Sequence, residues 1–130
     1  MKKVLLSIVL GLSLIGCSSL KSVPNKKILG KSYVLSSSSK DYKISLNFAE
    51  DNFFGYSGVN NYFGKYEVQG NNLKFDAIGS TLMSGPTKAM NAEIDYLNSL
   101  GEVNSFYFYK EQLVLKTING KKLLFNEIKD

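Results

Sequence analysis

The chain offers few side chains that could perform covalent or metal chemistry. Cys17 is the single thiol, and the 130 residues contain no His and no Trp. Without imidazole there is no Ser/His/Asp triad, and one cysteine allows neither a Cys/His zinc site nor an intramolecular disulfide. All 16 basic residues are lysines, so no guanidinium can hold a phosphate through two parallel hydrogen bonds. These absences favour a binding or structural role.

The acidic side chains offer no better basis for catalysis. Glu50 with Asp51 and Glu93 with Asp95 are the closest acid pairs, and neither spacing places two carboxylates on opposite sides of a scissile bond. No loop has the acidic spacing of a calcium motif, so we expect no metal and no cofactor. We therefore predict that the protein is not an enzyme.

The first residues have the layout of an export signal. A basic start precedes the apolar run 4–15, which is shorter than the roughly 20 residues that a transmembrane helix needs. The segment Leu14–Cys17 resembles the lipobox of bacterial lipoproteins. This resemblance implies that residues 1–16 are a signal peptide, and that the Cys17 thiol and the new terminal amine are acylated. The alternative is an ordinary secreted protein whose cysteine is incidental.

Residues 17–27 are then a lipidated tether that reaches at most roughly 35 Å when extended. Its lysines either approach an anionic leaflet or form a solvated linker. Losing residues 1–16, with two lysines, lowers the formal charge from +5 to +3, which argues against nucleic acid as a partner. We expect the bacterial cell envelope as the location, with the membrane bound through acylated Cys17. Ser18 resembles an outer-membrane sorting residue, which implies the periplasmic face if two membranes are present.

Residues 28–130 are expected to form one α+β domain. The run from Tyr42 to Phe48 alternates apolar and polar side chains, which is typical of a strand with one wet face. Asn119 and Gly120 predict a type I′ hairpin with positive φ at both residues. Strands are expected at 29–35, 42–48, 53–57, 62–68, 73–77, 105–109, 112–118 and 121–128, and 81–83 is either a short strand or the ragged end of the strand before it.

One helix is predicted over residues 86–100, with Gly101 as a left-handed stop. Its apolar stripe consists of Met90, Ile94, Leu97 and Leu100. Glu93 falls within this stripe, so its carboxylate must find hydrogen-bond donors. The expected architecture is a curved, barrel-like antiparallel β-sheet packed against a single α-helix.

A polar cluster is predicted where the helix meets a glycine-rich strand corner. We hypothesise that Glu93 accepts hydrogen bonds from backbone donors of the corner 58–61 and ties the sheet to the helix. Asn60 and Asn61 are expected to bond the turn's own backbone, and Thr81 to join the cluster. Glycines 55, 58 and 64 either cradle an anion or supply the positive φ and bulges of a corner.

Aromatic side chains suggest a second candidate site. On the strand 105–109, Phe106 and Phe108 are expected to face the core, and Tyr107 and Tyr109 to lie on the opposite side. The two tyrosines form either an exposed face for a peptide, lipid or glycan, or rings packed at a rim with their hydroxyls in water.

The segment 54–66 is similar to the glycine, Cys-Asn and Gly-x-Tyr motif of the META domain, the HslJ-type heat-shock lipoprotein family. A second block resembles that family's Thr-x-Met stretch and following helix, through Ile78, Ser80, Thr81, Met83, Pro86, Met90, Glu93, Tyr96, Leu97 and Leu100. The resemblance spans about residues 28–128. It implies a small envelope domain with a curved antiparallel sheet on a helix, often linked to stress or drug tolerance, with no established catalytic centre.

The sequence departs from the family pattern at several positions. Val59 and Gly85 stand where the family has cysteines, so a disulfide or thiol function of those positions is absent. Losing both together is coherent if the two cysteines were partners. Leu82 replaces the usual Arg, and Tyr33 the usual Trp.

These observations favour a non-enzymatic, lipid-anchored envelope domain that binds another envelope component, whether protein, peptide or glycan, or that contributes to stress tolerance. The alternative is a carrier that holds a small hydrophobic ligand in a cavity inside the curled sheet. A Phe-lined cavity of several hundred Å³ would favour the carrier, and a filled core with an exposed tyrosine face would favour the binding domain.

Overall fold

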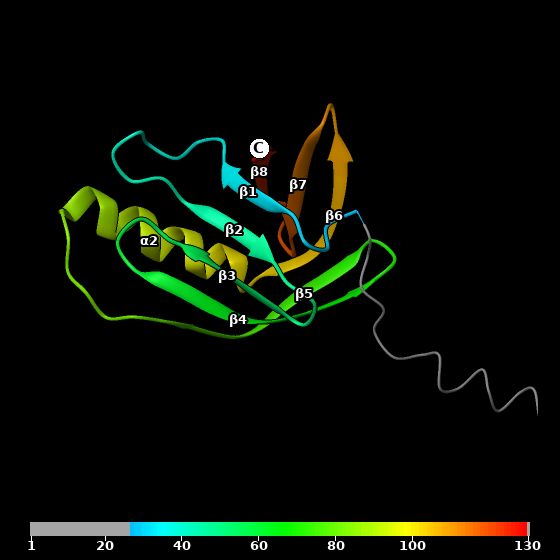
Figure 1. The fold of residues 1–130 in the computed structure, drawn as a ribbon, viewed down its shortest axis with the longest axis horizontal. Helices are drawn as coiled ribbons and strands as arrows, with labels where there is room; N and C mark the ends of the chain where they lie inside the picture. Colours follow the sequence, from blue (N-terminus) through cyan, green and yellow to red (C-terminus); the bar gives the residue numbers. More distant parts are fainter. Residues whose placement is uncertain (1–26, 130) are drawn as a thin grey trace, which may run out of the picture.

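The structure, a computed structural model, describes residues 27–129. Eight antiparallel strands follow one another around a closed barrel, which β1 and β8 complete by pairing (Figure 1). The strands are β1 (Ser32–Leu35), β2 (Ser45–Phe48), β3 (Asn52–Tyr56), β4 (Asn61–Gln69), β5 (Asn72–Ser80), β6 (Val103–Tyr109), β7 (Gln112–Thr117) and β8 (Lys122–Glu127). The helix α2 (Thr87–Leu100) connects β5 to β6. The expected barrel-like α+β fold is confirmed, whereas the signal peptide and Cys17 lie outside the described residues.

The alternation of side chains accounts for most of the strands. In β2, for example, Leu46 and Phe48 are buried and the residues between them are half-exposed. The segment 81–83 is not a separate strand but the ragged end of β5. β5 ends at Ser80, and only one further backbone bond, from Thr81 N to Asn61 O at 3.0 Å, continues the pairing before the chain leaves the sheet.

The turn after β7 differs from the predicted type I′ hairpin. Of the two residues Asn119 and Gly120, only Gly120 has a positive φ, of 90°. The Gly120 amide donates to Thr117 O at 3.0 Å, and Thr117 Oγ1 donates to Asn119 Oδ1 at 2.6 Å. These local bonds favour a longer turn, with the glycine at its single left-handed position.

The hairpin between β6 and β7 is the two-residue turn with positive φ at both positions. Lys110 and Glu111 have φ values of 49° and 66°, and Tyr109 pairs directly with Gln112. Such turns usually contain Asn and Gly, because side chains with a Cβ are strained there. The sequence carries no turn signal at this pair, so the tip could not be read from residue types.

The buried face of the helix overlaps the predicted stripe only in part, since Leu97 and Leu100 pack against the core and Ile94 does not. Ala89, Glu93, Tyr96 and Leu100 are buried, whereas Ile94 is 54% exposed. The small Ala89 lets the helix approach the glycine corner, where a Cβ on Gly58 would lie 3.4 Å from Ala89 O. Gly101 has a φ of −67°, so the predicted left-handed stop is also wrong.

Tyr96 orients the helix because its hydroxyl finds a partner inside the barrel. Tyr62 Oη donates to Ser45 O at 2.7 Å, so Tyr96 must donate to Tyr62 Oη, which lies 2.5 Å away. Burial raises the pKa of both phenols, which stay neutral donors. The Ser45 backbone and the Tyr62 ring leave no room for a side chain at Gly55, where a Cβ would lie 2.2 Å from Ser45 O and 2.9 Å from the ring.

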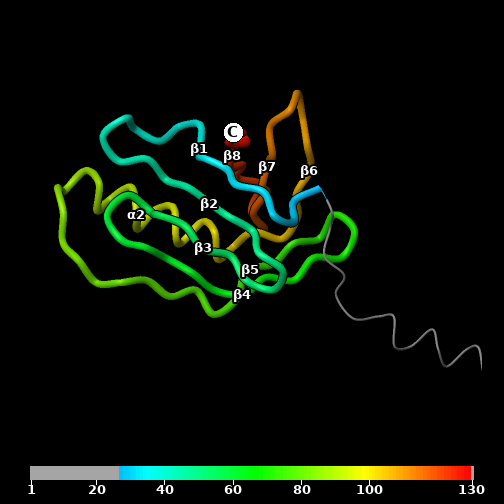
Figure 2. Tube along the Cα trace, viewed as in Figure 1, coloured from blue at the N-terminus to red at the C-terminus, as the bar shows by residue number. Residues whose placement is uncertain are grey.

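Aromatic rings fill the interior of the barrel. Phe53 and Phe75 meet edge to face at 4.9 Å between ring centroids, as do Phe48 and Tyr66 at 5.1 Å. Edge-to-face pairs contribute about 0.5–1.5 kcal/mol each beyond the area they bury. In Figure 2 the helix lies along the sheet, and its Tyr96 belongs to the same buried cluster. The rings therefore occupy the space that a ligand carrier would leave open.

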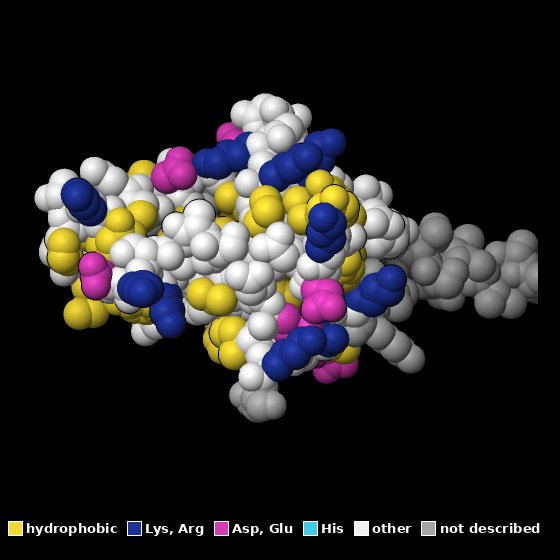
Figure 3. Space-filling model, turned by 90° about the horizontal axis from the view of Figure 1, so that it is seen from above, with side chains coloured by type: hydrophobic (Ala, Val, Ile, Leu, Met, Phe, Trp, Pro, Cys, Tyr) yellow, Lys and Arg dark blue, Asp and Glu magenta, His cyan; other side chains and the backbone are white. Residues whose placement is uncertain are grey.

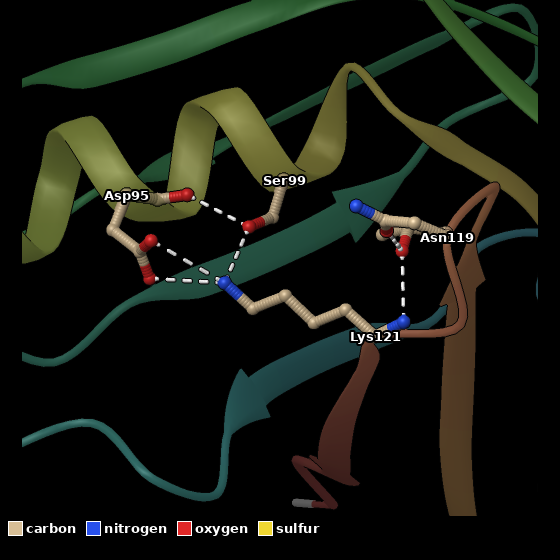
Figure 4. A network of polar contacts seen from close by, with 5 residues as sticks. Asp95, Ser99, Asn119 and Lys121 are labelled. Atoms are coloured by element: carbon tan, nitrogen blue, oxygen red, sulfur yellow. Dashed lines mark hydrogen bonds and ion pairs between the residues drawn. The ribbon is translucent and has the colours of Figure 1, made fainter.

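A lysine joins the last turn of the helix to the hairpin between β7 and β8. Lys121 Nζ donates to Ser99 Oγ at 2.7 Å and to the two carboxylate oxygens of Asp95 at 3.2 and 3.3 Å (Figure 4). The Ser99 hydroxyl in turn donates to Asp95 O at 2.9 Å. A cation near the carboxyl end of a helix is favourable, although an exposed ion pair contributes little, about 0–1 kcal/mol.

Candidate functional site

The glycine-rich corner between β3 and β4 lies against the first turns of the helix. Gly58 has a φ of 115°, a conformation that side chains with a Cβ rarely adopt. The Ser57 amide donates to Asn60 O at 2.8 Å, which closes the corner. Ser57 and Asn60 are both buried, so their polar atoms need partners inside the protein.

Glu93 supplies most of those partners. Its Oε2 accepts a hydrogen bond from the Ser57 hydroxyl at 2.5 Å and another from the Asn60 amide at 2.8 Å. Its Oε1 accepts from Asn60 Nδ2 at 2.8 Å. The predicted contact between the Glu93 carboxylate and backbone donors of the corner is therefore present.

These donors outweigh the cost of burying the charge. Desolvation alone raises the pKa of the Glu93 carboxyl, but the hydrogen bonds from Ser57, from Asn60 and from the Val59 backbone lower it. The net result is a pKa below the ordinary value of 4.5, so Glu93 is a carboxylate at neutral pH.

Asn60 extends the cluster to the loop that follows β5. Its Oδ1 accepts from the Met83 amide at 2.6 Å and from the Thr81 hydroxyl at 2.8 Å. Its Nδ2 also donates to Met83 O at 3.2 Å. One carboxamide thus joins the corner, the loop and the helix, so we call Ser57, Asn60, Thr81 and Glu93 the Glu93 cluster.

Three of the four residues predicted for this cluster are thus together. Asn61 contributes only backbone groups, since its amide donates to Thr81 Oγ1 at 3.2 Å and its side chain is exposed. Sequence reasoning missed Ser57 and the Met83 backbone. Ser57 precedes Asn60 by three residues, a spacing typical of hydroxyls that bond a turn, which could have identified it.

The cluster has the chemistry of a structural site. Both oxygens of Glu93 accept hydrogen bonds from buried donors, so neither is available as a general base. Within residues 27–129 no group of three His, Cys, Asp or Glu side chains could hold a metal ion. Glu50 and Asp51 are exposed in the turn between β2 and β3.

A groove of about 620 Å³ lies directly outside the cluster. Apolar side chains of the corner, the loop and the helix start form much of its lining, including Tyr42, Tyr56, Val59, Met83, Pro86 and Ala89. Val59 and Gly85, the two positions where the family has cysteines, are in contact here. A Cβ on Gly85 would lie 3.6 Å from Val59 Cβ.

Exposed apolar side chains continue from this groove over the outer face of the sheet. Phe54 on β3 and Phe63 on β4 are direct cross-strand neighbours, and they are 52% and 49% exposed. Tyr56 follows Phe54 on the same face of β3 and also lines the groove with Met83. We call Phe54, Tyr56, Phe63 and Met83 the β3–β4 apolar surface.

The second predicted site is less uniform than its sequence pattern suggests. Tyr109 is 57% exposed, but Tyr107 is only half-exposed. Phe106 is buried as expected, whereas Phe108 is 38% exposed, so its assignment to the core is wrong. Phe108 lines a cavity of about 270 Å³ together with Tyr33, so the inward direction of its side chain does not bury it completely.

Comparison with known proteins identifies the family of this chain. A META domain family model matches residues 26–130. The chain therefore belongs to the META domain family.

An NMR structure of a protein from Burkholderia xenovorans is similar to this chain, with a TM-score of 0.72 and 24% identity over 83% of this chain and 93% of that one. A second NMR structure has a TM-score of 0.63 and 18% identity over 80% of this chain and 94% of the other. At these identities the likeness shows the fold. The comparison with curated proteins finds no match.

The first prediction concerns the charge of Glu93. Glu93→Gln should lower the free energy of unfolding at pH 7 by about 1–3 kcal/mol, because an amide nitrogen then faces buried donors. Since the folded pKa is below the unfolded one, the contribution of the carboxylate is complete above about pH 4.5 and is lost as pH falls through the folded pKa. Denaturant unfolding of both proteins at several pH values should therefore show a difference that shrinks in acid. Equal stability at pH 7 would contradict the proposed role.

The second prediction concerns the contact between positions 59 and 85. A Cβ separation of 3.6 Å lies within the range of protein disulfides. In a Cys17→Ser background, Val59→Cys with Gly85→Cys should oxidise to a disulfide and stabilise the fold by about 3 kcal/mol. Thiol titration and thermal unfolding with and without reductant measure this, with each single variant as the control. A double variant that folds but stays reduced in air would show that the two positions are not apposed.

Proposed function

We propose that the protein is a lipid-anchored envelope domain that binds an apolar surface of another envelope protein and catalyses no reaction. The observation that carries this proposal is the β3–β4 apolar surface. Phe54 and Phe63 are half-exposed on paired strands of a barrel whose interior is filled by other rings. Rigid, exposed aromatic side chains of this kind bind at small entropic cost.

The composition of this surface favours a protein as the partner. Phe, Tyr and Met are enriched in the centres of protein interfaces, and charged residues are depleted there. Met83 lies in the loop that Asn60 fixes through two hydrogen bonds, so the flexible thioether is presented by an ordered backbone. A role in stress tolerance, as the family resemblance suggests, would follow from such a contact.

The carrier alternative has less support. The groove of about 620 Å³ is lined by Tyr, Val, Met and Pro side chains at the surface, and not by the phenylalanines inside the sheet. Phe53, Phe75 and Phe48 pack against one another in the core cluster. A ligand inside the barrel would have to displace these ring contacts.

The lipid anchor rests on the sequence around Cys17. The Cys17→Ser protein should be exported but lose its membrane attachment, because acyl chains contribute about 0.8 kcal/mol per buried methylene and serine does not accept them. Fractionation of cells by ultracentrifugation, with mass measurement of the terminal peptide, tests this. Ser19→Ala is the matched control and should stay membrane-bound. Equal membrane binding of exported Cys17→Ser protein would contradict the anchor.

The partner surface is tested by photo-crosslinking in cells. A photoreactive residue at position 54 or 63 should capture the same protein. Glu67 is the matched control, because it is exposed on the same face of β4 as Phe63 but lies beyond the apolar surface. A third probe at Tyr107 tests the tyrosine face. Capture of the same protein from Glu67, or adducts with glycan alone, would contradict the proposed surface.

A further inference from the structure

One end of the barrel brings lysines and apolar side chains together near the first described residue. A cavity of about 270 Å³ opens there, lined by Lys27, Lys31, Tyr33, Phe108, Glu111, Glu127 and Lys129. Phe108 and Ile128 are 38% and 48% exposed. Because β1 begins at this end and β8 ends at it, residues from both ends of the domain share one surface.

The tip of the hairpin between β6 and β7 belongs to the same end. Tyr109 is 57% exposed, and Lys110 Nζ lies 5.4 Å from the centre of its ring. Lys110 and Glu111 keep left-handed backbone conformations that Asn and Gly would adopt at lower cost. Strain of this kind is often retained where side chains have a function.

We propose that this end of the barrel, comprising Lys27, Lys31, Phe108, Tyr109, Lys110, Ile128 and Lys129, lies on the lipid surface that anchors the protein. We call these residues the lysine–aromatic end. The inference rests on the lipid anchor proposed above, and it adds an orientation: one defined face of the domain contacts the bilayer.

The length of the tether supports a lipid surface as the partner of the lysine–aromatic end. Lys27 lies ten positions after Cys17 in the chain, so Lys27, at the lysine–aromatic end, lies within roughly 35 Å of an anchored Cys17. The loop after β5 lies at the opposite end of the domain from the first described residues (Figure 1). The lysine–aromatic end is thus within reach of an anchored Cys17.

The charges and the aromatic groups fit a lipid headgroup region. Lys27, Lys31, Lys110 and Lys129 lie there beside two carboxylates, Glu111 and Glu127, and Lys31 Nζ lies 3.7 Å from Glu127 Oε2, so lysines outnumber carboxylates among the described residues of this end. Each lysine close to an anionic surface contributes about 1 kcal/mol. Tyrosine and lysine are enriched where proteins meet the membrane interface, because one end of each side chain is apolar and the other polar. Figure 3 shows lysine and hydrophobic side chains interspersed on the surface of the molecule.

Tyr33 gives the cavity a polar group that requires an acceptor. Its hydroxyl is buried and, among the described residues, has no hydrogen-bond partner. Burial and the nearby Glu127 raise the pKa of this phenol to about 12, so it stays a donor.

The absence of Trp from the chain makes a direct test possible. The lipidated full-length mature protein, carrying Tyr109→Trp, is reconstituted on vesicles of phosphatidylcholine and phosphatidylglycerol with brominated acyl chains. Leu82→Trp is the control, because Leu82 is 96% exposed in the loop at the opposite end. We expect bromine to quench Tyr109→Trp at least about twofold, as for side chains at the headgroup and acyl boundary, and to leave Leu82→Trp unchanged.

Charge reversal supplies a second readout. Lys110→Glu with Lys129→Glu, in the Tyr109→Trp protein, should reduce the quenching toward that of Leu82→Trp while the acyl chains still hold the protein on the vesicles. Equal quenching at both Trp positions, or none at position 109 in protein that floats with the vesicles, would overturn the orientation and leave the anchor intact. Lipidated protein that does not float with the vesicles would contradict the anchor and the orientation together.

Discussion

The burial of one carboxylate determines how the helix meets the barrel. Glu93 lies on the inward face of α2, where an unpaired charge would cost several kcal/mol. Its hydrogen bonds with Ser57 and Asn60 remove that cost only when the corner between β3 and β4 and the helix are both in place. Asn60 also bonds the Met83 backbone, so the loop that leads from β5 to the helix is held at the same point. The Glu93 cluster therefore joins the corner between β3 and β4, the loop after β5 and the helix.

The Glu93 cluster has a structural role, and the exposed surface beside it is the candidate for binding. The buried polar groups of the glycine-rich motif form hydrogen bonds with Glu93 and with one another. The motif that carries the family resemblance therefore supplies no free reactive group. What it exposes is apolar, since Asn60 holds Met83 beside Tyr56 at the rim of the groove. A buried polar cluster thus orders an exposed apolar surface. The proposed binding through this surface and the proposed membrane contact at the other end of the barrel require no catalytic residue.

The local sequence pattern predicted the structure correctly wherever the environment of a side chain depends on residues close to it in the chain. Alternation located the strands, and the position of Glu93 among apolar residues indicated that it needed donors. The errors came from interactions between distant segments. Ile94 was assigned to the core from the helical wheel alone. The hydrogen bond between Tyr96 and Tyr62, which turns Tyr96 inward, cannot be read from helix periodicity. Phe108 was assigned to the core because alternation gives the direction of a side chain, but not how much of that side chain its neighbours cover.

The sequence by itself determined the class of fold, the position of the helix, the need to pair Glu93 and the lack of imidazole or paired thiol chemistry. These properties depend on residue types and short spacings. Only the tertiary structure decided that Ser57 completes the cluster, that Val59 and Gly85 touch, and that Phe54 and Phe63 form an exposed pair. Each of these depends on the register between strands or on the rotation of the helix, which are set by packing over the whole barrel.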